Sequence, residues 1–159
     1  MASENPTLRR AARVLLLDGE RRVLLVRFRY QGRIWWATPG GGLEDGETHE
    51  DAARREVAEE TSFELQELGP LIWTREEVFR FEGHLYRQQE RYFVANVPAF
   101  DPRPRVIGAE EAKTFAGLRW WTLGELQATP EKFAPVDLAV LVERLFEQGP
   151  PEHPFEVGI

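Results

Sequence analysis

The chain has 159 residues, enough for one domain with a sizeable core, and its 42% hydrophobic and 30% charged residues are ordinary for a soluble globular protein. A net charge of −7 argues against nonspecific binding to a nucleic-acid duplex or an anionic membrane. Cysteine is absent, so disulfides, thiolate metal sites and a cysteine nucleophile are all excluded.

The first predicted elements are two strands that form a hairpin. Ala11 to Leu17 and Val23 to Tyr30 are apolar runs on either side of a turn at Asp18-Gly19. Alternation along the second strand places Arg27 and Arg29 on one face. If that face lines the glycine-rich loop further along the chain, these arginines would contact phosphate; the alternative is that they are solvated strand charges.

A helix is predicted after the glycine-rich turn that starts at Gly41. Thr48 is a suitable N-cap, and Asp51 stands where a capping box has its acid. At about 3.6 residues per turn, Glu56, Glu59 and Glu60 occupy positions i, i+3 and i+4 and therefore share one face of this helix.

Three carboxylates on one helix face repel one another, at a cost of a few tenths of a kcal/mol per pair in water. A divalent cation would offset this repulsion, and Mg²⁺ prefers hard oxygen ligands. Arg55 lies four residues before Glu59 and supplies a second, partial offset. The alternative interpretation is an ordinary solvated acidic helix.

Further strands and a final helix follow the acidic helix. Strands are predicted near Pro70 to Phe81, Leu85 to Val97 and Leu118 to Thr122, and an amphipathic helix at Pro135 to Gln148. The sequence also contains two tryptophan pairs, and because adjacent strand residues face opposite sides, one member of each pair is expected in the core. The pairs are Trp35-Trp36 and Trp120-Trp121.

The spacing around the acidic helix resembles a known signature. From Gly41, five residues precede Glu47, seven more precede Arg55-Glu56, and an aliphatic residue, an alanine and Glu59-Glu60 follow. This pattern resembles the signature of the Nudix hydrolases. At background frequencies of roughly 7% per residue type, six such identities in register would arise by chance about once in ten million starts.

One position departs from the signature. The family has a glycine where this chain has Ser62. A glycine there would suit the left-handed residue that commonly ends a helix, and a serine costs on the order of 1 kcal/mol in that conformation. The substitution affects the predicted end of the helix and none of the expected ligands.

The resemblance implies an α/β fold of the Nudix type, an α/β/α sandwich with a mixed β-sheet flanked by helices, in a single domain over residues 1–159 with short flexible ends at about 1–8 and 150–159. It also implies a site that binds Mg²⁺ or Mn²⁺. The implied ligands are the main-chain carbonyl of Gly40 and the carboxylates of Glu56, Glu59 and Glu60.

The same resemblance assigns roles around the metal. Arg55 and Glu47 would support the helix, and Glu60 is the expected general base. A later loop acid serves as the base in some relatives, which leaves Glu110 or Glu111 as alternatives. Gly41, with the two strand arginines, is expected to contact substrate.

The function implied is metal-dependent hydrolysis of a pyrophosphate bond, by water attack on phosphorus, in a nucleoside diphosphate linked to another moiety. The substrate would be a nucleotide-sugar, a dinucleoside polyphosphate or a modified nucleoside triphosphate. The sequence after the signature contains no motif that is typical of one of these substrate classes. The alternative is a catalytically silent nucleotide-binding module.

The partner expected is a small nucleotide, and a homodimer is common among relatives. Without an apolar run long enough for a membrane span or a signal peptide, a cytoplasmic protein is expected.

Overall fold

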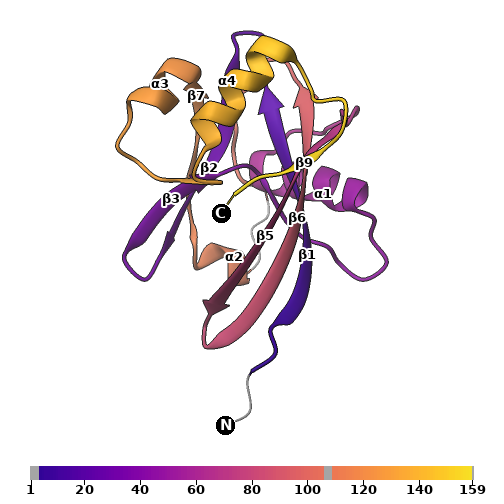
Figure 1. Cartoon of the computed structure of the whole chain (residues 1–159), viewed down its shortest axis with the longest axis vertical. Helices are drawn as coiled ribbons and strands as arrows, with labels where there is room; N and C mark the ends of the chain where they lie inside the picture. Colours follow the sequence, from indigo (N-terminus) through magenta and orange to yellow (C-terminus); the bar gives the residue numbers. More distant parts are fainter. Residues whose placement is uncertain (1–3, 106–108, 159) are drawn as a thin grey trace.

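The computed structural model describes residues 4–105 and 109–158, apart from the side chains of Glu110 and Glu111. Over these residues the chain forms a strongly curved mixed sheet with helices on both faces (Figure 1). The strands are β1 (Thr7–Leu17), β2 (Arg22–Tyr30), β3 (Arg33–Ala37), β4 (Gly40–Gly42), β5 (Leu71–Phe81), β6 (His84–Asn96), β7 (Phe115–Thr122), β8 (Phe133–Ala134) and β9 (Phe155–Glu156). The helices are α1 (His49–Thr61), α2 (Ala109–Ala112), α3 (Leu123–Ala128) and α4 (Leu138–Gln148).

The sheet order is β8-β3-β2-β1-β6-β5-β9, with β4 added to β1 and β7 added to β2. Strand β1 lies parallel to β6 along its whole length, from Thr7 opposite Tyr86 to Leu17 opposite Asn96. Its pairing with β2 is antiparallel and is recorded at Leu17 and Val23 alone. Beyond that point β4 pairs with β1, so the segment that follows β3 crosses to β1 and brings the glycine-rich loop into the sheet.

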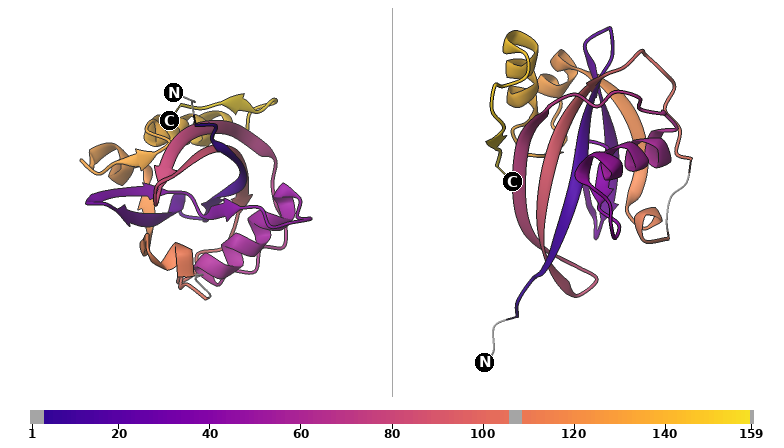
Figure 2. Two further views of the ribbon diagram at one scale, coloured as in Figure 1. Left: turned by 90° about the horizontal axis from the view of Figure 1, so that it is seen from below. Right: turned by 90° about the vertical axis from the view of Figure 1, so that its right-hand side faces the viewer.

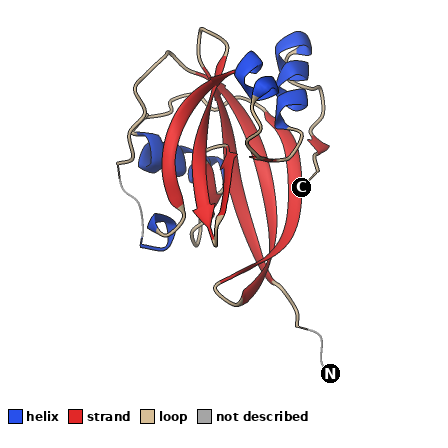
Figure 3. Ribbon diagram, turned by 90° about the vertical axis from the view of Figure 1, so that its left-hand side faces the viewer, coloured by secondary structure: helices blue, strands red, loops and turns tan. Residues whose placement is uncertain are grey.

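Two hydrophobic clusters lie on opposite faces of the sheet. Helix α1 contributes Ala52, Ala53 and Val57 to one cluster, together with the even-numbered residues of β1. Helices α3 and α4 cover the other face, where the odd-numbered residues of β1 and β2 are buried. Figures 2 and 3 show α1 separated from α3 and α4 by the curved sheet. The expected α/β/α sandwich is therefore confirmed.

The predicted elements are present with small changes in their bounds. The hairpin, the three later strands and the final helix all form, although α4 begins at Leu138, three residues after Pro135. Trp36 and Trp121 are buried in the core, whereas their neighbours are only partly covered, as expected for one member of each pair. The short elements β4, β8, β9, α2 and α3 were not predicted.

The two ends of the chain include strand residues. Strand β1 begins at Thr7, within the end that was expected to be flexible. Near the other end, β9 pairs in parallel with β5, with Trp73 opposite Phe155. Within residues 4–105 and 109–158, no helix has the length and hydropathy needed to cross a bilayer.

Candidate active site

Helix α1 begins as the sequence predicts. The Thr48 hydroxyl accepts a hydrogen bond from the Asp51 N–H at 3.1 Å, and the Asp51 carboxylate accepts one from the Thr48 N–H at 3.4 Å. This capping box fixes the first turn. The apolar face of the helix packs on the sheet, and the same rotation buries Glu56 and Glu60 on the side toward the glycine-rich strand β4.

The helix ends at Ser62, which adopts the left-handed conformation with φ of 68° and ψ of 10°. The expectation for this position is confirmed, because the serine occupies the backbone geometry for which a glycine is favoured. A later segment completes the end of the helix: the N–H groups of Arg103 and Arg105 donate to the carbonyls of Thr61 and Glu59, at 3.0 and 2.7 Å.

Arg55 connects the glycine-rich loop with the acidic face of α1. Its guanidinium forms a two-point contact with Glu47, at 2.7 Å from Nε and 2.9 Å from Nη2. Nη1 donates to Glu56 at 2.9 Å and to Glu59 at 3.2 Å. Nη2 also donates to the Gly42 carbonyl at 3.0 Å. One arginine therefore partly compensates three carboxylates and fixes the loop to the helix.

Glu56 lies against the loop at the position that requires glycine. A Cβ atom on Gly41 would lie 2.6 Å from Glu56 Oε1, so any side chain larger than hydrogen would displace the carboxylate. Glu56 is only 2% exposed, and its Oε2 is buried without a hydrogen-bond partner among the described residues. A buried carboxylate oxygen without a donor is costly, and a cation would satisfy it.

The backbone of Gly40 forms hydrogen bonds with both Glu60 and a strand arginine. The Gly40 N–H donates to Glu60 Oε1 at 3.3 Å, and the Gly40 carbonyl accepts from Arg13 Nη1 at 3.2 Å. Gly40 has φ of +150°, and a Cβ there would lie 2.1 Å from the Ala12 carbonyl oxygen. The backbone thus approaches β1 more closely than any other residue would allow.

Two carboxyl groups of the site have shifted acidity. Burial and the neighbouring charge of Glu56 raise the pKa of Glu59, although Arg55 acts in the opposite direction. The hydrogen bonds from Arg55 lower the pKa of Glu47 below its usual value. Glu47 is therefore a firmly ionised partner for Arg55, while a nearby cation would favour the charged form of Glu59.

The donor set suits a hard divalent cation in chemistry, because carboxylate and carbonyl oxygens are what Mg²⁺ and Mn²⁺ prefer. The arrangement is not closed around a common point, however. Within the described part of the chain, no three side chains of the types that bind metals are grouped as an ion would require. Glu56 and Glu59 each place one oxygen on Arg55 instead.

The remaining expected site residues lie apart from α1 in the sequence and differ in burial. Arg27 on β2 is partly buried, with Trp36 of β3 opposite it in the pairing, and Arg29 is exposed. Glu111 belongs to α2, but its side chain lies outside the described residues, as does that of Glu110. The prediction that one of these two glutamates acts as the general base therefore concerns side chains outside the described residues.

Sequence reasoning missed a buried ionic cluster beside the site. Arg13 Nε donates to Glu90 Oε2 at 2.7 Å, and Arg75 Nη1 donates to Glu90 Oε1 at 2.6 Å. Burial alone would raise the pKa of Glu90, but the charges and hydrogen bonds of the two arginines lower it to about 2. The available signal was a charged residue inside an apolar strand, since Arg13 interrupts the run from Ala11 to Leu17.

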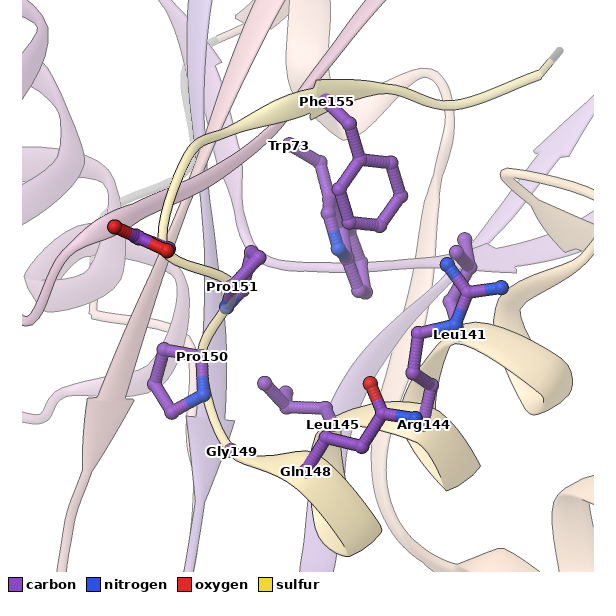
Figure 4. Close-up of a pocket in the computed structure, with 10 residues that line it drawn as sticks. Trp73, Leu141, Arg144, Leu145, Gln148, Gly149, Pro150, Pro151 and Phe155 are labelled. Carbon is purple, nitrogen blue, oxygen red and sulfur yellow. The ribbon is translucent and has the colours of Figure 1, made fainter.

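A shallow surface pocket lies on the face opposite α1. Helix α4 and the C-terminal segment form it, with Trp73 and Phe155 on one side and Leu145 on the other (Figure 4). It contains none of the expected site residues.

Comparison with known proteins agrees with this geometry. The family model described as NUDIX domain matches residues 7–143. An RNA pyrophosphohydrolase from Teredinibacter turnerae is 30% identical over 67% of this chain and 67% of its own length. The chain therefore belongs to the Nudix hydrolase family.

Solved structures share the fold at low identity. The MutT Nudix hydrolase from Burkholderia pseudomallei has a TM-score of 0.64 and 21% identity, covering 87% of this chain and 98% of that one. The MutT protein from Methanosarcina mazei has a TM-score of 0.65 and 19% identity, covering 92% and 98%. The Nudix domain of NrtR from Shewanella oneidensis, solved with ADP ribose, has a TM-score of 0.64 and 18% identity, covering 92% and 90%.

Proposed function

We propose that this protein hydrolyses a pyrophosphate bond in a nucleoside diphosphate linked to another moiety, using a divalent metal ion and water as the nucleophile. The observation that carries the proposal is the buried carboxylate of Glu56. Its Oε2 has no hydrogen-bond partner among the described residues, and it faces a loop where Gly41 leaves no room for a side chain. A buried carboxylate that lacks a hydrogen-bond donor is suited to binding a divalent cation, and such a cation can also bind phosphate.

Glu56, Glu59, Glu60 and the Gly40 carbonyl are the groups that would hold Mg²⁺ or Mn²⁺. When bound, such an ion neutralises phosphate oxygens and lowers the pKa of water. Because Arg55 now contacts both Glu56 and Glu59, the carboxylates would turn partly away from it as the metal site forms.

The protein's own groups would position the reactants and move the proton. Glu60 accepts a hydrogen bond from Gly40 and would take the proton of the attacking water, with Glu111 as the alternative base. Arg55 and Glu47 would keep the helix and the loop in register. Gly41, Arg27 and Arg29 would contact the substrate.

The comparisons support a nucleotide derivative as the substrate. One relative is named as an RNA pyrophosphohydrolase, and one domain of the same fold was solved with ADP ribose. Both names refer to nucleotide chemistry, and ADP ribose itself contains a diphosphate. A nucleotide-sugar, a dinucleoside polyphosphate and a modified nucleoside triphosphate all fit this description.

A nucleotide-binding module without activity is the second candidate. The observation that favours it is the open arrangement of the acidic groups, since no three of the described metal-binding side chains are grouped around one point. A protein that only binds nucleotide would, however, gain nothing from burying Glu56 and Glu60 together beside the loop.

The two candidates are separated by an activity panel. The protein would be incubated with Mg²⁺ or Mn²⁺ and nucleoside triphosphates, nucleotide-sugars and dinucleoside polyphosphates, with Glu60→Gln as the inactive control. Turnover that is lost in Glu60→Gln supports the hydrolase and identifies the substrate class. Absence of turnover, with one compound raising the melting temperature, supports the binding module.

A further inference from the structure

The first two glycines of β4 each lie against a charged side chain. A Cβ atom on Gly40 would lie 2.8 Å from Cδ of Arg13, and one on Gly41 would lie 2.6 Å from Oε1 of Glu56. Arg13 belongs to β1 and Glu56 to α1, and both elements contact β4. The backbone of the glycine-rich loop is therefore fixed by a strand arginine as well as by the acidic helix.

Arg13 also holds the loop by hydrogen bonds. Its Nη1 donates to the carbonyls of Thr38 and Gly40, at 3.4 and 3.2 Å. The N–H of Gly40 in turn donates to Oε1 of Glu60 at 3.3 Å. A carbonyl oxygen has two lone pairs, so the contact with Arg13 leaves one lone pair of the Gly40 carbonyl for a cation.

Glu90 of β6 keeps the guanidinium of Arg13 in this position. Nε of Arg13 donates to Oε2 of Glu90 at 2.7 Å, and Gln88 donates to the same oxygen at 3.0 Å. Burial would lower the pKa of Arg13, but the charge of Glu90 and, to a smaller extent, that of Glu60 raise it. Arg13 therefore stays charged, and its charge acts on Glu60 as well as on Glu90.

Stability gives little reason for these buried charges. A buried ion pair is often no more stabilising than apolar side chains of similar volume. Arg13 lies on the face of β1 where Leu15 and Leu17 belong to the core, so an aliphatic residue at this position would extend the hydrophobic cluster. The contact of the guanidinium with the loop backbone is what an aliphatic residue could not provide.

We propose that Arg13, held by Glu90, is a positioning residue of the active site: it fixes the peptide of Gly40, and through it the carboxylate of Glu60, for binding of the divalent cation. This inference rests on the proposed function and adds Arg13 and Glu90 to its site. Both residues act through Gly40 rather than by contact with the substrate. Replacing a group that orients metal ligands in this way typically changes metal affinity by about 10- to 100-fold.

Arg75 offers a matched control. Its Nη1 donates to the other oxygen of Glu90, Oε1, at 2.6 Å, and its Nη2 lies 3.1 Å from Glu77. The side chains of Arg13 and Arg75 are 15% and 4% exposed, so both are largely buried. In the described part of the chain, Arg75 has no hydrogen bond or ion pair with the glycine-rich loop. Arg13→Lys and Arg75→Lys therefore make the same change in one cluster, and only the first alters the contact with the loop.

The first test measures binding of Mn²⁺ without nucleotide, from the EPR signal of the free ion. Lysine keeps the charge but has a single nitrogen, so it cannot donate to Glu90 and to the loop from separate atoms. Arg13→Lys should weaken Mn²⁺ binding about tenfold or more, and Arg75→Lys less than about twofold. Glu90→Asp is a second variant, because it keeps the charge but shortens the side chain that holds Arg13, and it too should weaken binding. Melting temperatures without metal verify that each variant is folded.

Three results would overturn the inference: no Mn²⁺ binding by wild type, equal affinity in wild type and Arg13→Lys, or equal weakening in the two lysine variants. Equal affinity together with turnover by wild type would leave the proposed function standing. Conversely, Mn²⁺ binding that depends on Arg13 in a protein without turnover would reject the hydrolase and leave this inference standing.

The second test needs no metal ion. Hydrogen exchange of the Gly40 N–H would be followed by ¹⁵N NMR in buffer with EDTA. If Arg13 fixes the Gly40 peptide, its N–H should leave Glu60 more often in Arg13→Lys and exchange about tenfold faster than in Arg75→Lys. Equal exchange in the two variants would show that Arg13 does not position this peptide and would overturn the inference.

Discussion

Arg55 and Glu47 form a two-point ion pair, with Nε to Oε2 at 2.7 Å and Nη2 to Oε1 at 2.9 Å, across the turn between the glycine-rich loop and helix α1. The same guanidinium also donates to the Gly42 carbonyl. The contact needs a planar group with several donors, which lysine does not have.

Arg55→Lys should therefore loosen the loop while keeping the charge. We expect a loss of about 1–3 kcal/mol in the free energy of unfolding, measured in urea, together with reduced turnover. The control is Arg54→Lys at the adjacent, exposed position of the same helix. Unchanged stability and turnover in Arg55→Lys would show that the two-point contact has no role.

Glu60→Gln should abolish turnover with little effect on the fold. The amide oxygen of glutamine still accepts the hydrogen bond from the Gly40 N–H, but the side chain no longer takes up a proton. Loss of a general base typically lowers the rate by about 10²–10⁴-fold. Steady-state kinetics would measure this, with Glu50→Gln on an exposed position of the first turn as the control. A wild-type rate in Glu60→Gln would remove Glu60 from the mechanism.

Ser62→Gly should be neutral or mildly stabilising. Glycine relieves about 1 kcal/mol of strain at the left-handed φ of 68°, and this gain is partly offset because the serine hydroxyl donates to the Arg103 carbonyl. Thermal unfolding would measure the difference. A drop of several degrees would mean that the hydroxyl contact outweighs the backbone strain.

The buried cluster around Glu90 predicts a pH dependence of stability. The arginines lower the pKa of Glu90 from 4.5 to about 2 in the folded protein. A lowered pKa in the folded state stabilises the protein above pH 4.5, and this contribution, about 3 kcal/mol, is lost as the pH falls from 4.5 toward 2.

Glu90→Gln removes the titrating group and leaves two buried arginines without their carboxylate. At pH 7 we expect it to lower the free energy of unfolding by about 3–5 kcal/mol. The gap between wild type and variant should narrow as the pH falls below 4.5, which urea titrations at several pH values would record. Glu76→Gln, exposed on the adjacent strand, is the control. A gap that stays constant with pH would contradict the assigned pKa.

Local chemistry explains which features the sequence predicted. The capping box of Thr48 and Asp51 lies within four residues, and the left-handed end at Ser62 follows from a motif of fixed spacing. Alternation likewise predicted that one member of each tryptophan pair lies in the core, and the structure shows that these members are Trp36 and Trp121. These features depend on neighbours in the chain.

Long-range pairing explains what the sequence did not predict. Arg13 and Glu90 are 77 positions apart, and they meet because β1 and β6 are adjacent and parallel. The three-residue strand β4 is too short and too rich in glycine to show a periodic pattern, yet it brings Gly40 next to Arg13. The polar groups beyond Gly40 could therefore be found only in the folded structure.

The central claim is that the acidic face of α1 directs water to phosphorus with the help of a divalent metal ion. The most direct test is hydrolysis of a nucleoside triphosphate or the best compound of the panel in ¹⁸O-labelled water with Mg²⁺, followed by ³¹P NMR. We predict that one phosphate product acquires a single ¹⁸O atom, and that EDTA or Glu60→Gln abolishes the reaction. Turnover that persists in EDTA, or products without ¹⁸O on phosphorus, would contradict the claim.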